Sequence, residues 1–151
     1  MNMRNLLLFL HIATAIIIIG SLGFMDMVVP GMVRGGADNL PTLRKFHKLA
    51  GVFGPASMIV VLLGLALVLR QKNDYADFDD TWVSLSMLLF IVAAVIGSVF
   101  GAKTLRAGID KLESGQSADT EAGRLSMLGG VNILILLLIV WLMVDKPGIS
   151  S

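Results

Sequence analysis

Four long stretches without charged residues decide what this chain can fold into. They are 21, 21, 22 and 20 residues long and cover Asn5–Met25, Leu49–Leu69, Thr81–Ala102 and Leu125–Val144. A helix rises about 1.5 Å per residue, so about 20 residues cross the ~30 Å hydrocarbon core of a bilayer. The stretches predict four membrane-spanning helices and exclude a soluble enzyme.

The composition supports a chain that folds inside a membrane. Only 15% of the residues are charged, whereas soluble domains contain about 25%. The predicted fold class is all-α: one integral membrane domain, residues 1–151, forming an up-and-down, antiparallel four-helix transmembrane bundle. Its spans are expected at about 5–29, 50–70, 81–105 and 124–144. The first apolar run is longer than that of a signal peptide and is interpreted as a retained helix.

Cysteine content and net charge exclude several kinds of site. The chain has no cysteine and a net charge of +1. Disulfides, thiolate metal sites and cysteine nucleophiles are therefore excluded. A charge this close to zero indicates no nucleic-acid surface. The partner that the sequence does imply is the lipid bilayer.

The distribution of lysine and arginine predicts the orientation. The two terminal segments and the second loop together carry four of these residues, and the first and third loops carry eight. Short cytoplasmic loops are enriched in lysine and arginine. The first and third loops are therefore expected in the cytoplasm, and both termini outside.

The third span carries small residues on one stripe. Ala93, Gly97 and Gly101 follow one another at i, i+4 and i+8, and the fourth span offers Ser126 and Gly130. Small residues let membrane helices approach closely. The stripe either packs the four helices of one chain together or docks a second copy or another protein in a larger membrane complex.

Polar residues inside the spans are functional candidates by default. Ser57, Ser98 and Asn132 lie on the second, third and fourth spans at similar predicted depth. We expect Asn132 to bond to Ser57 or Ser98 and to stabilise helix packing by about 0.6–2 kcal/mol. Asp26 is expected near the cytoplasmic interface, where water hydrates it.

Of the two histidines in the chain, His11 lies inside a predicted span. It is interpreted as a metal or haem ligand, as a proton relay, or as a residue bonded to Ser86 or to a backbone carbonyl. His47 lies before the second span, about 20 Å away along the bundle axis, so both histidines cannot ligate one haem. In a haem site, Gly64 would leave room for the flat ring and Met87 would supply a sixth ligand.

Three short motifs resemble a known family. They are Leu10–Ala13 with Gly20-Ser21, Phe53–Ala56 with Leu63–Leu65, and Leu142–Gly148. In this order they resemble a family of small four-helix bacterial proteins described as predicted integral membrane proteins of unknown function. The pattern is more distantly similar to protoporphyrinogen oxidases of the HemJ type and to the CopD-type membrane domain. The resemblance implies a bacterial inner-membrane location, and the HemJ similarity implies b-type haem on His11.

Two functions from different classes follow. The first is a small, non-catalytic membrane protein that serves as an accessory subunit of a membrane complex. The alternative is a haem- or porphyrin-binding protein that uses His11 for electron transfer or porphyrinogen oxidation. A small-solute or metal permease is disfavoured because the predicted membrane interior lacks charge.

Overall fold

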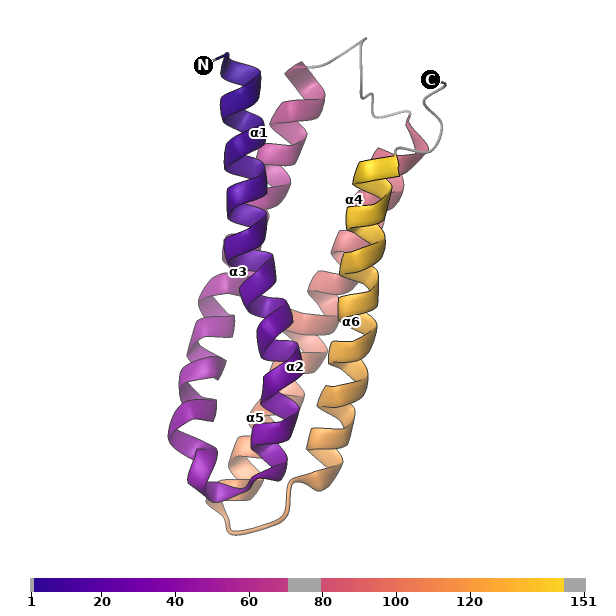
Figure 1. The fold of residues 1–151 in the computed structure, drawn as a ribbon. Coiled ribbons are helices and arrows are strands. Elements are labelled where there is room, and N and C mark those ends of the chain that lie inside the picture. The colour runs from indigo at the N-terminus through magenta and orange to yellow at the C-terminus, as the bar shows by residue number, and fades with distance from the viewer. Residues whose placement is uncertain (1, 71–79, 146–151) are drawn as a thin grey trace.

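The computed structural model describes residues 2–70 and 80–145, which are helical almost throughout (Figure 1). The acidic segment before Asp80 and the C-terminal Lys146-Pro147-Gly148 lie outside the described residues. The helical elements are α1 (Met3–Thr14), η1 (Ala15–Ile19), α2 (Gly20–Arg34), η2 (Ala37–Asn39), α3 (Leu40–Arg70), α4 (Thr81–Val95), η3 (Ile96–Gly101), α5 (Ala102–Glu113) and α6 (Asp119–Asp145).

These elements join into four rods that are long and apolar enough to cross a membrane. The rods are Met3–Arg34, Ala37–Leu69, Thr81–Glu113 and Asp119–Asp145. They run alternately up and down, and α1 begins at the end of the bundle where α6 finishes (Figure 1). The predicted all-α, antiparallel four-helix transmembrane bundle is confirmed. We call this the terminal end, and we call the end with residues 35–36 and 114–118 the loop end.

The helices continue beyond the expected spans at the loop end. The first rod runs through Pro30 to Arg34, and the third continues as α5 to Glu113. The extension is stable because α5 is amphipathic: it buries Leu105, Ile109 and Leu112 on one face, at the spacing of a helix stripe. A cluster of buried apolar residues fills this end: Met25, Val29, Val33, Leu43, Leu105, Ile109, Leu112, Ala118, Ala122 and Leu125.

Two glycines make the tight turns at the loop end. Gly36 follows α2 with φ 87° and Gly115 follows α5 with φ 73°, a region that side chains disfavour. Two ion pairs then tie the extended helices together. Arg44 Nη2 lies 2.6 Å from Glu113 Oε1, and Lys111 Nζ lies 2.8 Å from Glu121 Oε1.

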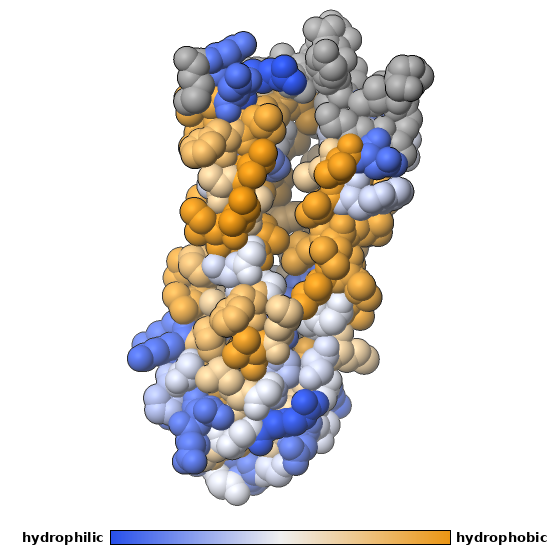
Figure 2. All heavy atoms as spheres, viewed as in Figure 1, coloured by the Kyte–Doolittle hydropathy of each residue, from blue (hydrophilic) through white to orange (hydrophobic). Residues whose placement is uncertain are grey.

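The terminal end is packed differently from the loop end. There α1 packs against α3, and α4 packs against α6, but the two pairs are not main neighbours of each other. Figure 2 shows a hollow between two apolar columns at this end, whereas the loop end is closed and largely hydrophilic at its surface. The two pairs are joined nearer the loop end, where α2 packs extensively on α6.

Proline and glycine produce the closest approach between helices α2 and α6. Pro30 has no N–H, so the Asp26 carbonyl, four residues earlier, lacks its usual helical partner. Helix α6 meets that carbonyl at Gly129: a Cβ built on Gly129 would lie 2.8 Å from the Asp26 carbonyl oxygen. Gly130, on the same turn, has no atom within 4 Å of such a Cβ. The sequence offered Ser126 and Gly130 as the small residues of this span, whereas in the structure Gly129 makes the close contact.

We expect Gly129→Ala to destabilise the protein by about 1–3 kcal/mol, because the methyl group would force α6 away from the α2 backbone. Gly130→Ala is the matched control and should leave stability unchanged or slightly raised, since it meets nothing. Thermal unfolding of the purified protein, followed by its helical circular dichroism, measures both. Equal melting temperatures for the two variants would contradict the close contact.

Candidate functional site

An acidic and an amide side chain meet between α2 and α6. Asn132 Nδ2 donates a hydrogen bond of 2.8 Å to Asp26 Oδ2. Asp26 lies eight residues before Arg34, and Asn132 lies eight residues after Arg124. Each is therefore about 12 Å along its helix from the basic residue at the loop end. This depth places the pair among the apolar parts of the spans.

The position of Asp26 corrects one expectation. Asp26 is partly buried and accepts the hydrogen bond of Asn132. Asn132 therefore bonds to neither Ser57 nor Ser98. A carboxylate is a stronger acceptor than a hydroxyl, and both serines bond within their own helices. The rod Met3–Arg34, which is long and apolar enough to cross a membrane, contains this ionisable group.

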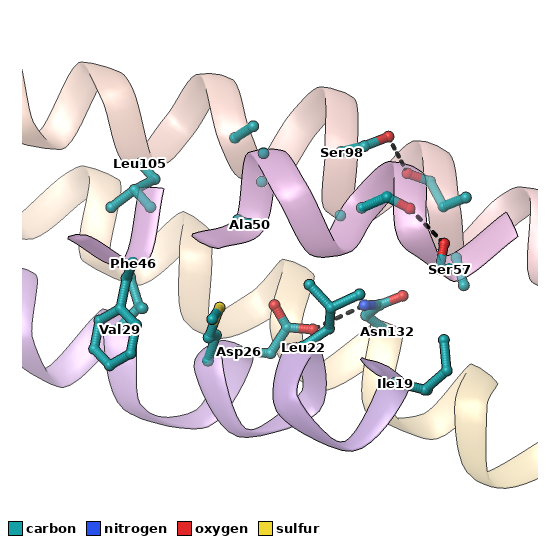
Figure 3. Close-up of a pocket in the computed structure, with 18 of the residues that line it drawn as sticks. Ile19, Leu22, Asp26, Val29, Phe46, Ala50, Ser57, Ser98, Leu105 and Asn132 are labelled. Carbon is teal, nitrogen blue, oxygen red and sulfur yellow. Dashed lines mark hydrogen bonds between the residues drawn. The ribbon is translucent and has the colours of Figure 1, made fainter. Parts of the chain in front are cut away.

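The Asp26–Asn132 pair borders a cavity of about 540 Å³ that all four rods line. Figure 3 shows Ser57, Ser98 and Asn132 gathered toward one end of it, with Phe46, Val29 and Leu105 at the other. Two π-helical segments face the cavity: η1 through Ile19, and η3 through Gly97, Ser98 and Gly101. Such wide turns inside α-helices frequently occur at functional sites.

The cavity is lined by hydrogen-bond acceptors. Ser57 Oγ donates to the Gly54 carbonyl, and Ser98 Oγ donates to the Ala94 carbonyl, so both hydroxyl oxygens keep only accepting capacity. Asn132 is 7% exposed, and its Oδ1 is buried without a partner among the described residues. In Figure 3 the Asn132 amide nitrogen points to Asp26 while the oxygen points the other way.

All three residues of the small-residue stripe of the third span line the cavity. Ala93 is buried, and a Cβ on Gly97 would lie 3.7 Å from Asn132 Nδ2. A Cβ on Gly101 would meet only the Ile96 carbonyl of its own helix. Ala93 and Gly97 therefore pack the helices of one chain together, which is one of the two alternatives that the sequence left open.

His11 is held by the neighbouring helix. Its Nδ1 lies 2.9 Å from the Val60 carbonyl oxygen. A carbonyl can only accept, so Nδ1 carries the proton, and the lone pair of the neutral ring is on Nε2. Of the partners considered, the structure shows the backbone carbonyl and not Ser86, whose buried hydroxyl has no partner in the described part of the chain.

Of the other residues considered for a haem site, Gly64 lies directly against the His11 ring. The imidazole itself covers Gly64: a Cβ there would lie 3.1 Å from His11 Cε1. Met87 is on α4, which packs against α6, whereas His11 is on α1, which packs against α3. His47 lines the cavity near the loop end, 13 residues and about 20 Å along α3 from Val60.

Comparison with known proteins supports the family expected from the sequence. Residues 5–147 match the family described as Predicted integral membrane protein (DUF2269). The chain belongs to this family. The chain is therefore an integral membrane protein of a family whose function is unknown. Searches of curated proteins and of solved structures returned no match, so the HemJ-type and CopD-type similarities find no support there.

Sequence reasoning missed the pairing of Asp26 with Asn132, although a signal for it was present. The first and fourth spans are antiparallel with respect to each other, and each residue stands eight positions from an arginine at the loop end. Counting inward from Arg34 and Arg124 would have placed the two side chains at the same depth. A first span that ends at residue 29 instead places Asp26 near its end.

We expect Gly64→Ala to destabilise the protein relative to Gly54→Ala. A methyl group on Gly64 presses on the imidazole and lengthens its bond to the Val60 carbonyl, at a cost of about 1 kcal/mol. Gly54 lies on the same helix with nothing within 4 Å of a built Cβ. Thermal unfolding in the wild-type and His11→Ala backgrounds measures the effect. A penalty at position 64 that persists without the imidazole would contradict this explanation.

Proposed function

We propose that the protein is a non-catalytic, ligand-binding subunit of the bacterial cytoplasmic membrane. Its ligand occupies the cavity between the four rods, beside Asp26 and Asn132. The observation that carries the proposal is the Asp26 carboxylate held by Asn132 at mid-depth in this cavity.

Two physical arguments support a binding role for the cavity. An ionisable group inside a span costs several kcal/mol unless it is paired or hydrated, so such groups are functional candidates by default. The volume of about 540 Å³ lies in the range of small-molecule sites, which are mostly apolar with a few polar groups. Phe46, Phe90 and Leu136 supply apolar walls of the same cavity.

The accessory role in a membrane complex belongs to the same proposal. It is supported by the terminal end, where α1 and α3 do not pack against α4 and α6 as main neighbours. Apolar side chains of both pairs border the hollow between them (Figure 2). A transmembrane helix of a partner protein would cover them.

A cysteine placed in the cavity should react with a water-soluble reagent. The chain has no cysteine, so Gly54→Cys and Gly130→Cys are single-thiol proteins. Both glycines have room for a side chain, but Gly54 lines the cavity and Gly130 is exposed on the surface of α6. In nanodiscs, a small uncharged methanethiosulfonate should modify the cavity thiol at least about tenfold faster, because thiolates form in water and not in lipid. Equal rates would defeat the proposal.

The orientation is part of the proposal. We place both termini outside the cytoplasm, because lysine and arginine are concentrated at the loop end. A reporter enzyme active only in the cytoplasm, fused after Ser151, should be inactive in intact cells, while the same reporter inserted at Gly115, in the α5–α6 turn, should be active. The reverse pattern would invert the topology.

One observation favours haem binding at His11 as a second candidate function. The bond from Nδ1 to the Val60 carbonyl fixes the ring and leaves the Nε2 lone pair free, which is how proteins commonly orient a ligating histidine. The room expected at Gly64 is not available, because the imidazole occupies it. Haem bound here would supply redox chemistry.

If this second candidate is right, protein purified after haem-replete expression shows a Soret band. The band should be lost in His11→Ala and kept in His47→Ala, because His47 is about 20 Å away along the bundle. A wild-type protein without a Soret band would remove this candidate, as would a band that survives His11→Ala.

A further inference from the structure

The groups around the Asp26–Asn132 pair specify what kind of ligand the cavity can bind. Asp26 presents a carboxylate, and Asn132 presents a buried Oδ1 without a partner in the described chain. The hydroxyls of Ser57 and Ser98 donate their hydrogen bonds to backbone carbonyls of their own helices. A ligand that satisfies these atoms must bring hydrogen-bond donors.

The backbone adds a further acceptor. Pro55 has no N–H, so the Gly51 carbonyl lacks its usual partner within α3. Gly51 is itself a lining residue of the cavity, as is Pro55. Pro55 therefore frees a carbonyl in α3 as Pro30 does in α2.

The charge of the lining points to a cation. No lysine or arginine is among the lining residues, and none forms an ion pair with Asp26 in the parts of the chain that the structure describes. Arg34 and Arg124 lie about 12 Å away along their helices. His47, the other titratable lining residue, lies ten positions from Ser57 on α3, about 15 Å toward the loop end. The carboxylate thus has no cationic partner of its own.

We propose that the cavity binds a lipophilic ammonium: a primary amine, protonated, on an apolar body. This proposal rests on the proposed function and names its ligand class. The ammonium group donates to the Asp26 carboxylate and to Asn132 Oδ1, with a serine hydroxyl or the Gly51 carbonyl as the third acceptor. The apolar body lies against Leu22, Phe46 and Phe90, which line the same cavity.

The volume distinguishes this ligand from an inorganic cation. A hard metal ion needs six or more oxygen ligands in a compact shell, and it would leave most of a cavity of about 540 Å³ unfilled. The described residues contain no cluster of three or more histidine, aspartate or glutamate side chains that could hold a metal ion. An organic ammonium uses the carboxylate, the free acceptors and the apolar walls together.

The test measures protection of the cavity thiol in the Gly54→Cys protein in nanodiscs. The probes are 2-phenylethylammonium, the neutral 2-phenylethanol and the anionic phenylacetate, which share one aromatic body and differ in charge and donors. We expect the ammonium to slow methanethiosulfonate modification about tenfold at saturation, and the other two to have little effect. Adding Asp26→Asn, which keeps the shape and removes the charge, should weaken the apparent affinity about tenfold or more.

Each remaining outcome has a separate meaning. Equal protection by the alcohol, protection by sodium chloride alone, or an unchanged affinity in the Asp26→Asn protein would overturn the ammonium assignment and leave a binding cavity. Normal labelling that no probe slows would also overturn it. A thiol at position 54 that reacts no faster than one at position 130 would remove the proposed function itself. Gly130→Ala, on the exposed surface of α6 and outside the cavity lining, controls for general disturbance and should retain protection.

Discussion

The contact between α2 and α6 at Asp26 fixes the arrangement of the bundle. Lipid gives helices no hydrophobic reason to associate, so they associate through close packing and hydrogen bonds. Pro30 leaves the Asp26 carbonyl open, Gly129 lets α6 come against it, and Asn132, one turn further, bonds the Asp26 side chain. Backbone and side chain of one residue are thus both engaged by one turn of α6, which sets the register between the first and fourth rods.

That register explains why the two ends of the bundle differ. Toward the loop end, α2 and α6 are held together and close a core with α5 around Val33, Leu43 and Ala122. Toward the terminal end, α1 packs against α3 and α4 packs against α6, with no comparable contact between the two pairs. The cavity lies where the closed part gives way to the separated part. It is bordered by the π-helical segments η1 and η3, where the helical turns are wider than in an α-helix.

The fold could be predicted from the sequence because length and charge decide it: about 20 uncharged residues must cross the bilayer as a helix. The exact contacts could not. The sequence does not distinguish the adjacent glycines Gly129 and Gly130. The rotation of α6 about its axis determines which of them contacts the Asp26 carbonyl. The partner of Asn132 depended on the length of the first helix. Pro30 suggested an end to it, whereas burial of Val33 in the loop-end core keeps it helical to Arg34.

His11 and Asp26 show how neighbours decide whether a polar residue in a span carries function. From the sequence, His11 is a stronger functional candidate than Asp26, because it is a histidine inside a predicted span. In the structure its Nδ1 is hydrogen-bonded to the Val60 carbonyl and its ring packs over Gly64. Helix α3 therefore already provides a hydrogen-bond partner for this side chain. Asp26 receives one amide hydrogen bond and borders a cavity in which Ser57 Oγ, Ser98 Oγ and Asn132 Oδ1 remain as acceptors. An arrangement of acceptors around a carboxylate does not stabilise the negative charge of that carboxylate. A donor that enters the cavity makes it favourable, and this makes Asp26, rather than His11, the residue from which a ligand can be argued.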